Sequence, residues 1–228
     1  VREVYRKMIA EGVERDYAKA IVTYLSIILD KCASSSNSLA RWQSNGEKIA
    51  DLFARQALPM LWDYCEVNVI NGKSRSYREL KSDVLTNIQE QKISNTVPTT
   101  NAFSATSIPY NDNYFDAVIT DPPYYDNVPY SYLSDFFYVW LKRSIGDLYP
   151  ELFSTSLTPK KNEIVAYSTG TGGVEAGKRQ FEEMLSQAFS EIHRVLKPNG
   201  LAVIVYAHKT TEGWETLINS LLDSGLVM

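Results

Sequence analysis

An acidic residue, two prolines and two aromatic residues follow directly where an apolar stretch of the sequence ends. Residues 119–126 read ITDPPYYD. Proline lacks a backbone N–H and ends a strand ladder, which leaves neighbouring carbonyl oxygens as acceptors. The carboxylate of Asp121 can accept a hydrogen bond from an amino group, and Tyr124 offers a flat aromatic face. These groups suit a planar molecule that carries an NH2 group, such as the edge of a nucleobase.

The elements around this stretch predict an α/β fold. Apolar patterning indicates strands over residues 115–120 and 201–206, and helices over residues 132–143, 179–196 and 211–224. The continuous apolar run of the second strand is typical of a strand buried on both faces of a parallel sheet. Ligands of such sheets bind beyond the carboxyl ends of the strands, which is where the DPPY stretch lies. A proline turn with an acidic cap explains the same residues without a ligand, and the pattern alone leaves both interpretations open.

The remaining sequence predicts three segments. Residues 1–70 are expected to form a helical segment, with helices over 1–32 and 46–64, and residues 71–100 a mobile polar linker with one short helix. Residues 101–228 form the predicted α/β domain. Within it, the sequence KPNG before the second strand predicts a turn in which Gly200 takes a positive φ.

Composition limits the function classes. The chain has 228 residues, of which 44% are hydrophobic and 22% charged, as in ordinary globular proteins. It has no apolar run of the roughly 18 residues that span a membrane, and its charged beginning lacks a signal-peptide core, so we expect a cytoplasmic protein. Two cysteines and two histidines without metal-ligand spacing predict no metal site. The net charge of −4 neither indicates nor excludes a nucleic-acid partner.

Three further patterns are candidates for ligand contacts. His208 and Lys209 follow the second strand, where a polar pair reaches either a substrate or only solvent. Basic doublets suit either phosphate contacts or solvated helix ends; they are Lys142-Arg143, Lys160-Lys161 and Lys178-Arg179. Residues 172–178 fit the spacing of a phosphate loop, but Arg179 stands where that loop needs Ser or Thr, so we favour a solvated loop.

The residues Asp121, Pro122, Pro123 and Tyr124 match the (D/N/S)PP(Y/F/W) motif of the amino-methyltransferases. These enzymes transfer a methyl group from S-adenosylmethionine to the exocyclic amine of adenine (N6) or cytosine (N4) in DNA. The stretch HRVLKPNGLAVIV resembles the next helix–strand unit of their Rossmann-like fold. The stretches DPPYYDNVPYSYLSDFFYVWLKR, RQALPMLWDYCEVN and AHKTTEGWETLI resemble a prokaryotic family known as adenine-specific DNA methylases. That similarity extends over most of the chain, although the zinc-ribbon cysteines of some members are absent.

The resemblance implies a role for each motif residue. Asp121 and the carbonyl oxygen of Pro122 or Pro123 would accept hydrogen bonds from the target amine and stabilise the positive charge that develops on it. Tyr124 would stack on the base, which a duplex must first flip out. Tyr125 and Asp126 are expected to line the same pocket, and His208 and Lys209 to contact the substrate.

The same resemblance implies S-adenosylmethionine as cofactor and DNA as partner, and this chain departs from the family on the cofactor side. Residues 1–118 contain no glycine-rich DPFxGxG loop, and Ser104 stands where many of these enzymes have an acidic residue that contacts the cofactor. Of the named residues, only Ser104 and Asp121 remain as cofactor contacts. We therefore expect a partial Rossmann-like methyltransferase fold, its C-terminal half, that is weakly active or inactive without the rest of the protein.

Two alternatives stay open from the sequence. The first is a non-catalytic nucleic-acid-binding or assembly module that retains the fold. The second is an amino-methyltransferase that acts on RNA or on a protein, because related motifs occur in those enzymes. Among DNA bases, adenine N6 is favoured over cytosine N4 because the similarity is to adenine-specific enzymes.

Overall fold

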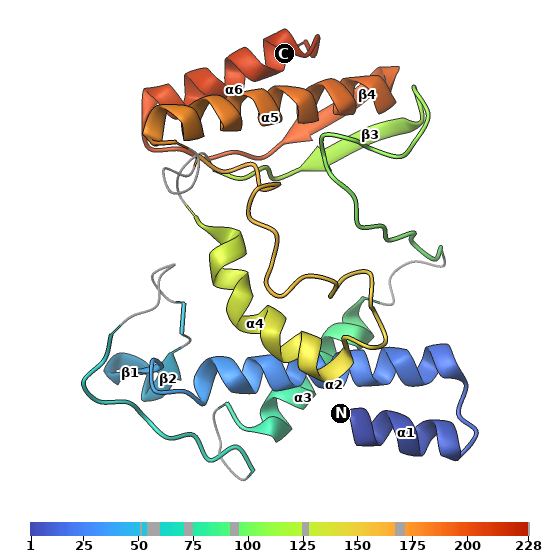
Figure 1. Cartoon of the computed structure of the whole chain (residues 1–228), viewed down its shortest axis with the longest axis vertical. Coiled ribbons are helices and arrows are strands. Elements are labelled where there is room, and N and C mark those ends of the chain that lie inside the picture. Colours follow the sequence, from blue (N-terminus) through green and yellow to red (C-terminus); the bar gives the residue numbers. More distant parts are fainter. Residues whose placement is uncertain are drawn as a thin grey trace. The chain divides into compact units, whose positions relative to one another are not determined.

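A computed structural model describes residues 1–50, 52–53, 60–70, 75–91, 96–124, 128–166 and 172–227. These residues form six α-helices, a short 3₁₀ helix and two small sheets, a mixed helix-and-sheet structure compatible with the α/β expectation (Figure 1). The chain divides into two compact units. The helical unit comprises Val1–Val97 with Tyr130–Lys160, and the sheet unit comprises Pro98–Pro129 with Lys161–Met228. No helix among the described residues is long and apolar enough to cross a membrane.

The helical unit is organised around one long helix. Its elements are α1 (Arg2–Ala10), α2 (Arg15–Ser35), β1 (Arg41–Gln43), the 3₁₀ helix (Ser44–Gly46), β2 (Lys48–Ala50), α3 (Tyr77–Glu90) and α4 (Tyr130–Ile145). Helix α2 packs against α1, α3 and α4. The α2–α3 contact buries Ile28, Cys32 and Leu80. This unit therefore groups residues 130–160 with the N-terminal segment, and the division into three segments stays a prediction.

The single helix predicted over residues 1–32 is wrong, because the chain forms two helices there. Gly12 adopts a φ of +79° after α1, a conformation that glycine reaches without steric strain. Glu14 then caps α2, and its carboxylate accepts hydrogen bonds from the backbone N–H groups of Asp16 and Tyr17 at 2.8 and 2.7 Å. The apolar spacing of both helices is helical, so periodicity alone does not reveal the break between them.

The helix predicted over residues 46–64 is also wrong wherever the structure describes it. Residues 48–50 form β2, which pairs antiparallel with β1 in the register Arg41↔Ala50. Asn45-Gly46, a common turn sequence, lies between the two strands. Residues 60–64 are not helical, and residues 51 and 54–59 lie outside the described part. The turn signal therefore prevails over the helical spacing of the apolar residues.

The sheet unit contains the predicted strand–helix–strand arrangement. Its elements are β3 (Phe115–Thr120), α5 (Val174–Val195), β4 (Leu196–Ile204) and α6 (Thr211–Asp223). The predicted strand over 115–120 and helix over 211–224 are confirmed. The helix predicted over 132–143 is also confirmed, as α4 of the helical unit. Strands β3 and β4 pair in parallel, with Thr120 opposite Ile204. Helices α5 and α6 lie side by side against the sheet (Figure 1).

One face of this sheet is covered and the other is exposed. The core between the sheet and the two helices consists of Phe181, Leu185, Phe189, Ile192, Leu217 and Leu221, with Val118, Ala202 and Ile204 packed against it. Alternate residues on the strands point the other way, and Ile119 and Leu201 are 76% and 64% exposed. The expectation that the second strand is buried on both faces is therefore wrong within the described structure.

The KPNG sequence lies inside β4 instead of forming the predicted turn. The register shifts there, because Phe115 pairs with Leu196 but Ala117 pairs with Leu201. The φ of Gly200 is not positive. Glycine is needed for space instead, since a Cβ at this position would come within 2.7 Å of the Leu196 side chain and 3.0 Å of the Asp116 carbonyl oxygen.

Candidate functional site

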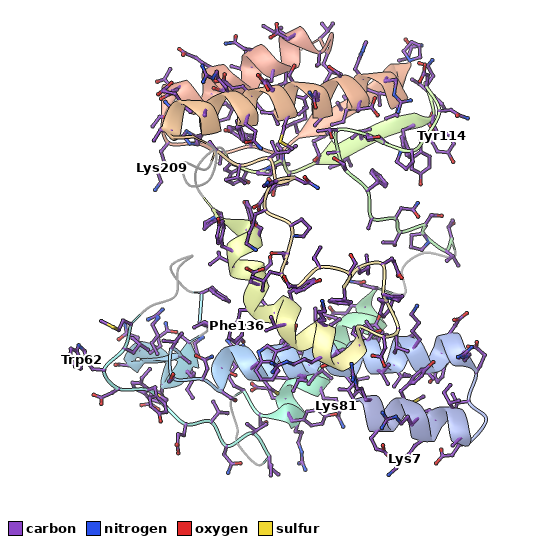
Figure 2. The ribbon with its side chains drawn as sticks, viewed as in Figure 1. Lys7, Trp62, Lys81, Tyr114, Phe136 and Lys209 are labelled. Atoms are coloured by element: carbon purple, nitrogen blue, oxygen red, sulfur yellow. The ribbon has the colours of Figure 1, made fainter. Side chains whose placement is uncertain are left out.

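The site residues predicted from the sequence lie at one edge of the β3–β4 sheet. Residues 121–124 follow β3 directly, and residues 205–209 follow β4. Because the strands are parallel, both segments leave the sheet at its carboxyl edge. Figure 2 labels Lys209 at this edge and Tyr114, which precedes β3, at the opposite edge. The backbone N–H of Val205 donates to the carbonyl oxygen of Thr120 at 2.9 Å, which holds the two strand ends together.

The DPPY stretch presents its carboxylate to solvent from a buried backbone. Asp121 is exposed, Pro122 is buried, and Pro123 and Tyr124 are half-buried. Proline restricts the backbone next to Asp121, which limits the directions in which its side chain can leave the chain. Asp121 makes no hydrogen bond or ion pair with any residue that the structure describes, and it can therefore accept hydrogen bonds from a ligand. The predicted pocket residues Tyr125 and Asp126 lie outside the described residues.

Tyr206, which the sequence pattern does not single out, packs against Tyr124 and against a second aromatic residue, Trp214. The ring of Tyr206 meets the Tyr124 ring edge-on at a centroid distance of 5.4 Å and the Trp214 ring edge-on, also at 5.4 Å. Edge-to-face contacts of this kind favour a defined ring orientation. Tyr206 follows β4 by two residues and Trp214 lies in the first turn of α6, so their contact depends on how α6 packs beside the strand end. The only available sequence signal is that both follow the second strand.

His208 lies in a turn whose residues hydrogen-bond to one another. Its Nδ1 lies 3.2 Å from the backbone nitrogen of Thr210, whose N–H donates to it. The indole N–H of Trp214 donates to the His208 carbonyl oxygen at 3.1 Å. The imidazole stacks on Tyr206, with 6.4 Å between ring centroids. His208 thus lies beside Tyr206 at the carboxyl edge, and Lys209 is exposed; a contact of either residue with substrate stays a prediction.

Ser104, the predicted cofactor contact, lies on the approach to β3. It is exposed, and its Oγ accepts a hydrogen bond from the backbone N–H of Thr106 at 3.2 Å. The two hydroxyl groups also lie 2.8 Å apart. Ser104 therefore stabilises its own turn before β3, whereas Asp121 and His208 follow β3 and β4. The described structure does not join Ser104 to those two residues.

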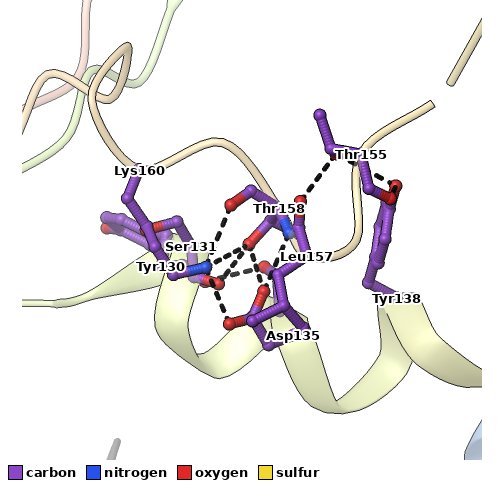
Figure 3. Close-up of polar contacts among 9 residues, drawn as sticks. Tyr130, Ser131, Asp135, Tyr138, Thr155, Leu157, Thr158 and Lys160 are labelled. Atoms are coloured by element: carbon purple, nitrogen blue, oxygen red, sulfur yellow. Dashed lines mark hydrogen bonds and ion pairs between the residues drawn. The ribbon is translucent and has the colours of Figure 1, made fainter. Parts of the chain in front are cut away.

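Lysines of two basic doublets make contacts inside their own units. In the helical unit, Lys160 forms an ion pair with Asp135 at 2.7 Å, and Thr158 donates to the same carboxylate (Figure 3). The hydrogen bonds from Lys160 and Thr158 lower the pKa of Asp135 against the opposing effect of its burial. In the sheet unit, Lys178 pairs with Glu212 at 2.6 Å. These lysines neutralise carboxylates of the chain itself, which makes them poor candidates for phosphate contacts.

Arg194 of α5 fixes the loop that leads into β3. Each of its five N–H groups has an acceptor: Glu191 Oε1 and Oε2, Asp112 Oδ1, and the carbonyl oxygens of Ile108 and Tyr110, all at 2.7–2.9 Å. Its hydrogen bonds, with one from the backbone N–H of Ile108, lower the pKa of Glu191 to about 2. This network sets the position from which β3 starts and, through β3, the position of Asp121.

Replacing Arg194 with lysine is expected to lower the free energy of unfolding, because an ammonium group cannot make the planar set of bonds. Urea denaturation at neutral pH measures the change. Arg179→Lys, an exposed position on the same helix, is the matched control and should change stability little. Equal effects of the two substitutions would contradict the role given to Arg194.

A groove between α5 and α6 is lined by acidic side chains, so its charge is opposite to that of a phosphate-binding site. It has a volume of about 690 Å³, and its lining includes Glu182, Glu183, Glu212, Glu215 and Asp223. Carboxylates repel phosphate groups, so this groove does not suit a nucleic acid. No group of three or more His, Cys, Asp or Glu side chains within the described ranges could hold a metal ion.

The chemical case for a site therefore lies in the carboxyl edge of the sheet. It consists of the exposed Asp121 followed by two prolines and Tyr124, and of Tyr206, whose ring contacts those of Tyr124, His208 and Trp214. This arrangement can bind a planar group that carries an amine. Comparison of the chain with protein-family models, with curated proteins and with solved structures finds no match.

Proposed function

We propose that this chain is the base-binding part of an S-adenosylmethionine-dependent methyltransferase that acts on the exocyclic amine of a DNA base, with adenine N6 favoured. The observation that carries the proposal is the exposed carboxylate of Asp121 at the carboxyl end of β3, followed by Pro122, Pro123 and Tyr124. The match to the amino-methyltransferase motif is thereby supported by its structural context, the end of a parallel strand.

The proposed chemistry of Asp121 follows from the electronic structure of an aromatic amine. The nitrogen lone pair of adenine N6 is delocalised into the ring and is a poor nucleophile. A carboxylate that accepts a hydrogen bond from this N–H concentrates electron density on nitrogen and favours a pyramidal nitrogen, whose lone pair is less delocalised into the ring. Methyl transfer would break the sulfur–methyl bond of the donor and form the nitrogen–methyl bond. The positive charge that this places on nitrogen would be stabilised by the nearby anion until the N–H proton is lost to solvent. Tyr124 holds the ring by stacking.

The cofactor supplies an electrophilic methyl group, and the described residues do not fit it. The chain contains no glycine-rich cofactor loop before β3, and the Ser104 hydroxyl group bonds within its own turn. We therefore place the cofactor-binding half in another part of the same protein and derive no step from residues of this chain on the cofactor side. The exposed apolar face with Ile119 and Leu201 supports this proposal, because parallel sheets are normally covered on both faces.

Calorimetric titration with S-adenosylmethionine tests the proposal against a non-catalytic module. The full-length protein is expected to bind the cofactor. The 228-residue chain is expected to bind it at least about tenfold more weakly, because the loss of contacts worth about 1.4 kcal/mol lowers an affinity tenfold. Absence of binding by the full-length protein would favour the module. Equal affinity of the two proteins would contradict the division into a base-binding and a cofactor-binding half.

A further inference from the structure

Tyr206 connects the core of the sheet unit to the candidate site. Its side chain packs against the core cluster formed by α5 and α6, which includes Phe181 and Leu217. Its ring also contacts three rings at the carboxyl edge: Tyr124 at 5.4 Å and 81°, Trp214 at 5.4 Å and 84°, and His208 at 6.4 Å and 18°. Tyr206 is the residue that these three contacts share.

The segment that carries Tyr206 is fixed by contacts that do not involve Tyr124. The Tyr206 hydroxyl group donates to the carbonyl oxygen of Gly213 at 3.3 Å, and the Trp214 indole donates to that of His208 at 3.1 Å. Gly213 has no side chain, and the His208 ring occupies the space that a Cβ would fill. Tyr206 therefore stands on a preorganised turn of residues 206–214.

Tyr124, the partner of Tyr206 in this contact, is half-buried and follows two prolines. An edge-to-face contact with a fixed ring restricts how its own ring can turn. The contact with Tyr206, a residue with no assigned part in the motif, therefore helps to set the face that Tyr124 presents to a ligand.

We propose that Tyr206 is a positioning residue, which orients Tyr124 for stacking on the target base. The proposal rests on the proposed function for its ligand, a nucleobase, while the contact itself stands on the structure alone. An edge-to-face pair strengthens association about two- to tenfold, and this is the loss we expect in base binding when the Tyr206 ring is removed.

Two measurements on the 228-residue chain separate the contact from the function. The first is fluorine NMR with 3-fluorotyrosine at position 124, which reports the surroundings and motion of that ring without DNA. The second is the affinity for a single-stranded oligonucleotide that carries 2-aminopurine, an adenine analogue whose fluorescence reports stacking. Both are compared between the wild-type chain, Tyr206→Leu and Tyr206→Phe. Tyr114→Leu is the matched control, because Tyr114 packs in an aromatic group at the other edge of the sheet.

Tyr206→Leu is expected to shift the fluorine signal of position 124 and to weaken oligonucleotide binding about two- to tenfold. Tyr206→Phe keeps the ring and loses only the hydrogen bond to Gly213, so it should stay closer to wild type than Tyr206→Leu, and Tyr114→Leu should match wild type in both measurements. Because Tyr206 also packs on the core, the reciprocal experiment guards against unfolding: fluorine at position 206 should respond to Tyr124→Leu, which removes a half-buried ring at the surface.

The outcomes are distinguishable. An unchanged fluorine signal in both directions overturns the positioning role, and so does a changed signal with unaltered oligonucleotide affinity. If the wild-type chain leaves 2-aminopurine fluorescence unchanged, the proposed function in base binding fails, and the fluorine comparison alone then decides whether Tyr206 orients Tyr124.

Discussion

Replacing Asp121 with alanine is expected to reduce methyl transfer by the full-length protein about 10²–10³-fold, the usual effect of removing one group that stabilises developing charge. The carboxylate is exposed and makes no contact with other described residues, so its loss should leave the free energy of unfolding nearly unchanged. Transfer of a labelled methyl group to DNA measures the rate, and urea denaturation measures stability. Asp121→Asn keeps an acceptor oxygen without the charge, so an intermediate rate is expected.

Asp116→Ala is the matched control for this experiment. Asp116 is an exposed carboxylate on the same strand, and it pairs with Lys197 at 2.5 Å. Such a surface pair contributes on the order of 0–1 kcal/mol to stability and lies before the carboxyl end of the strand. Its removal should leave methyl transfer unchanged. An Asp121→Ala protein with wild-type activity, or an equal loss in both variants, would show that the motif is assigned wrongly.

Replacing Asp30 with asparagine is expected to stabilise the protein at pH 8. Asp30 lies on α2, is only 8% exposed, and its Oδ1 has no hydrogen-bond partner among the described residues. Burial raises the pKa of its carboxyl group from 3.8 to about 7, because the charged form loses its hydration. The difference corresponds to a cost on the order of 4 kcal/mol for the ionised form, at 1.36 kcal/mol per pH unit.

The sign of the pH dependence follows from this raised pKa. Protonated Asp30 is favoured in the folded protein, so its contribution to stability is complete below pH 3.8 and is lost as the pH rises to about 7. Unfolding free energies of wild type and Asp30→Asn should therefore diverge across this range, with the variant more stable above it. Glu191 acts in the opposite direction at lower pH, between its ordinary value of 4.5 and about 2, but it does so in both proteins.

Asp83→Asn, an exposed position on α3, controls for the loss of one negative charge. Its stability should follow the wild-type pH profile. If the difference between wild type and Asp30→Asn stays constant from pH 4 to pH 8, the carboxyl group of Asp30 does not titrate in the folded protein over that range.

The sequence is most informative where local pattern and tertiary environment agree. Residues 115–120 form β3 as predicted. The helix predicted over 211–224 is α6, which ends at Asp223. Predictions fail where one short signal prevails over periodicity: Gly12 divides the first helix, and Asn45-Gly46 makes a hairpin. The lack of space for a side chain at Gly200 comes from Leu196 and from the Asp116 carbonyl oxygen. Because Asp116 lies on another strand, a local interpretation of the KPNG sequence could not reveal this.

The candidate site likewise has one part that the local sequence predicts and another that only the tertiary structure reveals. Asp121, Pro122, Pro123 and Tyr124 are adjacent in sequence, so their types and order are enough to suggest chemistry. Tyr206 and Trp214 could not be assigned in this way, because the contact of Tyr206 with Tyr124 arises only when β4 pairs beside β3, and its contact with Trp214 only when α6 packs beside it. The basic doublets are ambiguous in sequence because the acidic partners of Lys160 and Lys178 lie 25 and 34 residues away in the chain.

The most direct test of the proposed function is the identity of the methylated product. Full-length protein is incubated with labelled S-adenosylmethionine and DNA, RNA or protein, and the digested products are separated by mass spectrometry. We predict label in DNA as N6-methyladenine, and none with Asp121→Ala. Label in N4-methylcytosine would change the base but keep the role of Asp121. Label only in RNA or protein, or equal N6-methyladenine from the Asp121→Ala protein, would contradict the proposed function.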